Sequence, residues 1–222
     1  DAMESRGLGD VYKRQIKLSK EIKKYVNKGD RCLIISENRP EWFITDLSIM
    51  LSGSITVPAY TTYIERDYEY IIDDCKPSLI FVSNLEQFNK IKNILKKKHF
   101  IKKLFSFENL VNENEYQNLS HFFTNLKIEG NILKTNIVRG DPACIIYTSG
   151  TQGNPKGVIL SHGGILNNCE GGIEILKPIT LKKKINFLTW LPLSHSYEHT
   201  VQFVQISVGA RIFYAESMEK KN

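Results

Sequence analysis

The sequence predicts an α/β fold in which repeated β-α units form mostly parallel sheets with helices on both faces. Two observations support this class. Short apolar runs of strand length alternate with segments whose apolar residues recur at helical spacing, and glycines and prolines separate them. The composition, with 41% hydrophobic and 24% charged residues in a chain of 222, is typical of a protein with a buried core. No apolar run approaches the roughly 20 residues that a membrane-spanning helix needs.

The first block of elements occupies residues 16–126 and forms the first predicted α/β subdomain. Pro40 suits the first turn of a helix that Gly53 ends, and Pro77 ends the following helix. Apolar runs predict strands at 31–36, 55–57, 79–82 and 104–107, and helical spacing predicts helices at 16–26, 41–51, 66–75, 85–95 and 116–126.

A polar and poorly periodic stretch, residues 127–140, is expected to connect this block to a second α/β subdomain at 141–222. In this second block a glycine-rich turn at 148–156 joins the first two strands. The expected strands are 143–147, 157–160, 186–191 and 211–214, and the expected helices are 164–176 and 197–207.

Both ends of the chain are unusual. Residues 1–15 have no clear helical or strand period, and the chain does not open with methionine. We therefore expect a non-native or disordered leader ahead of Ile16. Because residues 218–222 are polar and follow no terminating element, we expect the chain to be part of a longer protein.

The charge pattern argues against a nucleic acid partner. The formal net charge is +6, and much of the excess lies at 92–103 and 182–184. Short lysine runs are usually solvated surface, and no aromatic-interleaved basic motif accompanies these. A peripheral contact of the lysine-rich segment 92–103 with anionic lipid, at the inner face of a membrane, stays open.

The cysteines are typical of a reduced, cytoplasmic protein. Cys32, Cys75, Cys144 and Cys169 lie far apart with no C-x-x-C pair, so we expect neither a disulfide framework nor a thiolate zinc site. The N-terminus lacks the apolar stretch of a signal peptide. These observations predict buried thiols and a cytoplasmic location.

The segment 147–157, which reads YTSGTQGNPKG, combines the groups that a polyphosphate needs. Glycines let backbone N–H groups turn toward a ligand, hydroxyls add donors, and Lys156 adds a cation. The segment matches neither the Walker pattern, because Pro155 precedes the lysine and Gly157 follows it, nor the dinucleotide G-x-G-x-x-G pattern. Spacing alone therefore leaves a phosphate loop and a structural β-turn both open.

Three stretches together resemble one family. YTSGTQGNPKGVILSH resembles the signature loop of the AMP-forming long-chain fatty acyl-CoA synthetases, in the adenylate-forming superfamily of acyl-CoA ligases and luciferases. ENRPEW, continuing into LSGSITVPAYTT, and WLPLSHSYEHT resemble two further segments of these enzymes. This chain departs from the pattern at Gln152, where a hydroxyl is usual, and at His199, where arginine is usual. The second departure puts in doubt a salt bridge at that position.

The resemblance implies part of the large N-terminal domain of an ATP-dependent fatty acid–CoA ligase, which forms acyl-AMP and transfers the acyl group to coenzyme A. It implies His195 and Lys156 as catalytic residues and Thr148 or Thr151 as the contact to Mg²⁺. The ATP phosphates would be held by Thr148, Ser149, Gly150, Thr151, Gln152, Gly153 and Lys156, and a pocket would involve Trp190, Glu198 and His199. In the family the adenine site, the hinge and the C-terminal domain come later in the chain, so we expect the 222-residue chain to be inactive alone.

Other functions stay open. Another carboxylate-activating enzyme of the same superfamily is the nearest. HSYEH also matches the H-x-x-E-H zinc-hydrolase motif, with a third ligand from Glu216, from Glu219 or from sequence outside these 222 residues. An inactive binding module is a further alternative. Trp42 and Trp190 are expected to be core residues.

Overall fold

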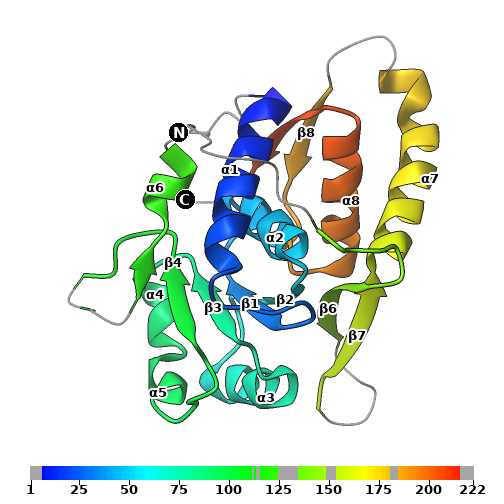
Figure 1. Ribbon diagram of the computed structural model, residues 1–222. Helices are drawn as coiled ribbons and strands as arrows, with labels where there is room; N and C mark the ends of the chain where they lie inside the picture. The colour runs from blue at the N-terminus through cyan, green and yellow to red at the C-terminus, as the bar shows by residue number, and fades with distance from the viewer. Residues whose placement is uncertain are drawn as a thin grey trace.

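The computed structural model describes residues 7–111, 113, 116–124, 135–148, 154–180 and 185–215 (Figure 1). Within these residues, seven strands form one sheet in the order β5-β4-β3-β1-β2-β6-β7. All neighbours are parallel except the hairpin partners β6 and β7. The strands are β1 (Arg31–Ile35), β2 (Ile55–Ala59), β3 (Leu79–Val82), β4 (Lys103–Ser106), β5 (Gln117–Asn118), β6 (Pro142–Thr148) and β7 (Lys156–Ser161).

Helices cover both faces of this sheet, as the continuous burial of its central strands requires. Ile34 of β1 packs toward α1 (Gly7–Ile22), α2 (Pro40–Ser52) and α6 (Ser120–Thr124). Its neighbours Leu33 and Ile35 pack toward α3 (Glu65–Cys75), α4 (Leu85–Asn89) and α5 (Lys92–Leu95) on the other face. Successive side chains of a strand point to opposite faces, so a strand that is apolar throughout fits only a sheet covered on both sides.

A second group of elements follows the hairpin. Helices α7 (His162–Thr180) and α8 (Ser196–Ser207) lie side by side, and β8 (Asn186–Thr189) pairs in parallel with β9 (Arg211–Tyr214) (Figure 1). The two helices approach closely at Gly172, where an added Cβ would lie 2.7 Å from Val204 Cγ2. A third apolar cluster, which includes Cys144, joins these helices to β6.

Helix α2 shows how local sequence sets the boundaries. Pro40 occupies the first turn, where a missing N–H costs no hydrogen bond. Gly53 ends the helix at φ 87°, a left-handed conformation that glycine adopts without strain, and its N–H donates to Ile49 O and Met50 O. Trp42 is fully buried between these ends, as the sequence predicted.

The structure confirms the α/β class and corrects several boundaries. Helix α1 begins at Gly7, so the expected limit of a leader at residue 15 falls inside it. Val11 packs against the core, and Gln15 Nε2 donates to Leu47 O at 3.3 Å. Residues 1–6 lie outside the described residues.

Two predicted helices were wrong in form. The segment 85–95 forms two short helices, α4 and α5, rather than one. Where a helix was expected at 116–126, the chain forms the short strand β5 and then α6. In both places only a few apolar residues recur at helical spacing, and so short a pattern does not distinguish one continuous helix from shorter elements joined by turns.

The predicted subdomain boundary was also misplaced. Thr56 of β2 pairs with Cys144 of β6, so β6 and β7 complete the first sheet rather than begin a second subdomain. The separate sheet of the described residues contains β8 and β9. Of the expected connector, residues 135–140 contain no helix or strand, and 127–134 lie outside the described part of the chain.

Candidate active site

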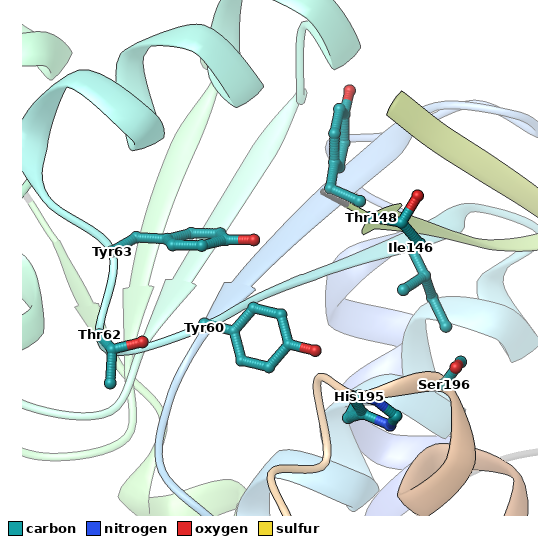
Figure 2. A pocket seen from close by; sticks show the side chains of 8 residues that line it. Tyr60, Thr62, Tyr63, Ile146, Thr148, His195 and Ser196 are labelled. Atoms are coloured by element: carbon teal, nitrogen blue, oxygen red, sulfur yellow. The ribbon is translucent and has the colours of Figure 1, made fainter. Parts of the chain in front are cut away.

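A cleft of about 430 Å³ opens at the carboxyl ends of β2 and β6 (Figure 2). The chain leaves β2 toward α3 and β3 but leaves β6 in the opposite direction, toward β7. Such a switch point between neighbouring strands is where open α/β sheets bind ligands. The cleft is lined by Tyr60, Thr62, Tyr63, Ile146, Tyr147, Thr148, His195 and Ser196.

One wall of the cleft consists of tyrosines. The Tyr60 and Tyr63 rings make an edge contact with centroids 5.4 Å apart, and Tyr68 Oη donates to Tyr60 O at 2.7 Å. Burial raises the pKa of both Tyr60 and Tyr63, so their hydroxyls stay protonated at neutral pH. The wall thus offers flat apolar surface together with neutral hydroxyl groups, which suits a ligand with apolar and polar parts.

His195 forms the opposite wall, at the start of α8 (Figure 2). Its Nδ1 accepts a hydrogen bond from the Tyr197 N–H at 3.2 Å, so the ring also caps the helix. A neutral imidazole that accepts at Nδ1 carries its proton at Nε2. His195 therefore presents a hydrogen-bond donor beside the positive end of the α8 dipole, an arrangement that favours an anion.

Asn38 fixes the segment that leads to His195. Its Nδ2 donates to Leu191 O at 2.7 Å, and its Oδ1 accepts from the Leu193 N–H at 2.9 Å. Asn38 belongs to ENRPEW, and the segment that it holds belongs to WLPLSHSYEHT. Sequence reasoning named both stretches but missed that this amide joins them across about 150 residues of chain.

The glycine-rich segment begins at the same edge of the sheet. Thr148 ends β6, Lys156 begins β7, and the two residues are partners in the antiparallel register. Both are exposed, and among the described residues the Lys156 ammonium makes no ion pair. Ser149, Gly150, Thr151, Gln152 and Gly153 were predicted phosphate contacts and lie outside the described residues.

The three residues expected to line a pocket do not line this cleft. Trp190 is 52% exposed at the end of β8, so its prediction as a core residue was wrong. Glu198 is buried beside β8, and burial raises its pKa although a hydrogen bond with Thr189 acts in the other direction. His199 is buried among α2, β6 and α8.

The two histidines of HSYEH, His195 and His199, are not placed to bind one zinc ion together. Both ring nitrogens of His199 face other groups, with Nε2 2.8 Å from Asp46 Oδ2 and Nδ1 4.0 Å from Cys144 Sγ. His195 faces the cleft instead. No group of three His, Cys, Asp or Glu side chains suited to a metal occurs in the described part of the chain, from which Glu216 and Glu219 are missing.

Three of the six lysines in the lysine-rich segment 92–103 make ion pairs among the described residues. Lys92 pairs with Glu113, Lys98 Nζ lies 2.6 Å from Asp73 Oδ1, and Lys102 Nζ lies 3.4 Å from Asp30 Oδ2. These pairs reduce the positive charge that the segment would present to lipid. Among the helices that the structure describes, none has the length and apolar character to cross a bilayer.

Comparison with known proteins agrees with the resemblance seen in the sequence. A family model described as AMP-binding enzyme matches residues 9–222. Long chain acyl-CoA synthetase 3 of Arabidopsis thaliana is 32% identical in an alignment over 214 residues that covers 91% of this chain and 32% of that protein. A long-chain-fatty-acid–CoA ligase of Mus musculus is 30% identical in an alignment over 194 residues that covers 82% of this chain and 29% of that protein.

Solved structures show the same fold. A red-emitting luciferase from Phrixothrix hirtus superimposes with a TM-score of 0.80 at 21% identity, covering 95% of this chain and 41% of that one. The chain spans about a third of the length of the curated relatives described above. Because the family model covers nearly all of the sequence, the chain belongs to the AMP-binding enzyme family.

Proposed function

We propose that this chain supplies the phosphate-binding and carboxylate-binding part of an AMP-forming fatty acid–CoA ligase with a preference for long acyl chains. The observation that carries the proposal is the position of the YTSGTQGNPKG segment, whose first threonine lines the same cleft as His195. The names of the relatives support fatty acids as the substrate class.

The reaction has two steps. A carboxylate oxygen attacks the α-phosphorus of ATP, which forms an acyl–phosphate bond and releases pyrophosphate. The thiolate sulfur of coenzyme A then attacks the acyl carbon, and AMP leaves. Neither step requires a covalent bond to the protein, so this chain contributes by holding the reactants and stabilising charge.

In this proposal the glycine-rich segment binds the β- and γ-phosphates. Thr148 and Lys156 lie opposite one another at its two ends, and the exposed Lys156 ammonium provides a cation for phosphate oxygens. Backbone and side-chain donors of Ser149, Gly150, Thr151, Gln152 and Gly153 complete the set. Mg²⁺ favours hard oxygen ligands. The exposed Thr148 hydroxyl, or that of Thr151, would offer one such ligand beside the phosphate oxygens. When bound, the ion would neutralise phosphate charge.

His195 has a separate role. Its Nε2–H donates toward the carboxylate or an α-phosphate oxygen, where negative charge accumulates as the new bond forms. The Tyr60 and Tyr63 rings provide apolar surface and neutral hydroxyl groups along the same space.

The test uses the protein expressed from the complete reading frame that contains this sequence. Fatty-acid-dependent exchange of pyrophosphate into ATP is measured for the wild type, for Lys156→Ala and for the control Lys97→Ala. Lys97 is an exposed lysine that does not line the cleft. We expect Lys156→Ala to lower exchange at least about 100-fold, as removal of one charge-stabilising donor does in other enzymes, and Lys97→Ala to leave it unchanged. Equal exchange in both variants would refute the assignment of Lys156.

The nearest alternative is a ligase for a different carboxylate. Exchange with short or aromatic acids, and none with fatty acids, would keep the adenylation step and reject the fatty acid. We also propose that the 222-residue chain does not turn over by itself. Measurable acyl-CoA formation by the chain alone would contradict this.

A further inference from the structure

Helix α3 contacts both ends of the glycine-rich segment. The Tyr147 hydroxyl, immediately before Thr148, donates to Asp74 Oδ2. The Tyr70 hydroxyl donates to Pro155 O at 3.1 Å, immediately before Lys156. Tyr70 and Asp74 are four residues apart on α3, so their side chains project from the same face of the helix.

The Tyr147 ring reaches α3 because the residue opposite it has no side chain. Tyr147 pairs with Gly157 in the β6–β7 register. A Cβ added at Gly157 would lie 2.8 Å from Ile145 Cγ2 and 3.3 Å from Tyr147 Cζ. Neither distance leaves ordinary room for a methyl group, so this glycine serves the packing of the tyrosine.

The contacts to α3 are made by well-anchored groups. Tyr147 is 3% exposed, and Tyr68, Ile71 and Ile72 hold α3 against the sheet. Burial and the bond to Asp74 raise the pKa of Tyr147, so its hydroxyl remains a donor at neutral pH. The Tyr147 hydroxyl reaches the exposed Asp74 carboxylate at the edge of this packing, so the bond between them is partly buried.

We propose that Tyr70 and Asp74 are positioning residues that fix the two ends of the glycine-rich segment for binding the ATP phosphates. The inference rests on the proposed function, because it assigns no new ligand. Neither side chain is among those lining the cleft, so both act through Tyr147 and Pro155. Fixing both ends in advance reduces the ordering that ATP binding must otherwise impose.

The test compares Tyr70→Phe and Asp74→Ala with two matched controls in the protein from the complete reading frame. Asp73→Ala removes the adjacent carboxylate of α3, which pairs with Lys98 and does not contact the segment. Tyr12→Phe removes a hydroxyl from an exposed tyrosine of α1. The readout is pyrophosphate exchange as a function of ATP concentration and, separately, of fatty acid concentration.

We expect Tyr70→Phe and Asp74→Ala, each of which removes one partner of a hydrogen bond, to raise the half-saturating ATP concentration about three- to tenfold, the usual effect of one lost hydrogen bond. The half-saturating fatty acid concentration and the maximal rate should stay within about twofold, and both controls should match the wild type. Amide hydrogen exchange on this chain should accelerate at residues 154–158 in the two variants while β1 and β3 keep their protection.

Each outcome has a separate meaning. A wild type that shows no exchange with any acid overturns the proposed function and this inference together. A wild type that is active, with an unchanged ATP dependence in Tyr70→Phe and Asp74→Ala, overturns the inference alone. A loss of maximal rate shared with Asp73→Ala also overturns it, because that pattern indicates general destabilisation of α3.

Discussion

His199 Nε2 lies 2.8 Å from Asp46 Oδ2, and both side chains are buried. The contact joins α8 to α2, and the Trp42 ring packs edge-on against the imidazole with centroids 5.4 Å apart. The departure from arginine at this position therefore leaves a polar link to an acidic partner, where the sequence put such a link in doubt. His199 follows His195 by one helical turn, so the link also fixes the end of α8 that borders the cleft.

The buried pair predicts a large stability effect at His199. His199→Ala leaves the Asp46 carboxylate buried without this partner, and the loss should lower the free energy of unfolding by about 3–5 kcal/mol. Urea unfolding of this chain measures the change. A decrease below about 1 kcal/mol would show that the pair contributes little.

His195 should behave in the opposite way. His195→Asn keeps a good N-cap residue while removing the imidazole, so the free energy of unfolding should change by less than about 1 kcal/mol. Pyrophosphate exchange in the protein from the complete reading frame should fall about 100-fold or more. Retention of wild-type exchange in this variant would remove His195 from the reaction.

Asn38 is predicted to hold the segment that leads to His195 in place. Asn38→Ala leaves Leu191 O and the Leu193 N–H without their partner, at a cost of about 1–3 kcal/mol in unfolding free energy. Since the same segment leads to His195, exchange should fall as well. Asn38→Asp keeps the acceptor for Leu193 and should recover part of both properties; equal loss in the two variants would argue against this role.

Glu198 predicts a pH dependence of stability. Burial raises its pKa in the folded state, so the folded protein holds this proton at pH values where the unfolded chain has released it. The contribution of Glu198 is therefore fully present below its ordinary pKa of 4.5 and is lost as pH rises through the raised value. The free energy of unfolding of Glu198→Gln, relative to that of the wild type, should therefore increase from pH 4 to pH 8.

Parallel urea titrations at both pH values provide the measurement. The surface variant Glu174→Gln, which alters an exposed carboxylate of α7, is the control and should show a much smaller change with pH. A difference between Glu198→Gln and the wild type that shrinks toward pH 8 would contradict the burial argument.

The sequence was sufficient for the features that depend on local pattern. Strands such as Leu79–Val82 are apolar throughout, which only a sheet covered on both faces accommodates, and Pro40 and Gly53 mark the ends of α2. The position of the glycine-rich motif directly after a buried strand also follows from the sequence, whereas its spacing left a phosphate loop and a structural β-turn both open.

The features that it missed depend on contacts distant in sequence. No local sequence pattern indicates that β6 pairs with β2. The expected subdomain boundary was therefore placed before β6, although β6 belongs to the first sheet. The partner of His199 is 153 residues away on α2, and the support of Pro155 by Tyr70 spans 85 residues. Helical spacing placed His199 correctly on α8 but did not show that it faces the core while His195 faces the cleft.

The central claim is that this site activates a fatty carboxylate with ATP. Its most direct test is pyrophosphate–ATP exchange by the protein from the complete reading frame, measured over fatty acids of increasing chain length with short and aromatic acids alongside. We predict exchange that requires an added acid and is greatest with long-chain fatty acids. No exchange with any acid, from a folded protein that contains this chain, would contradict the account.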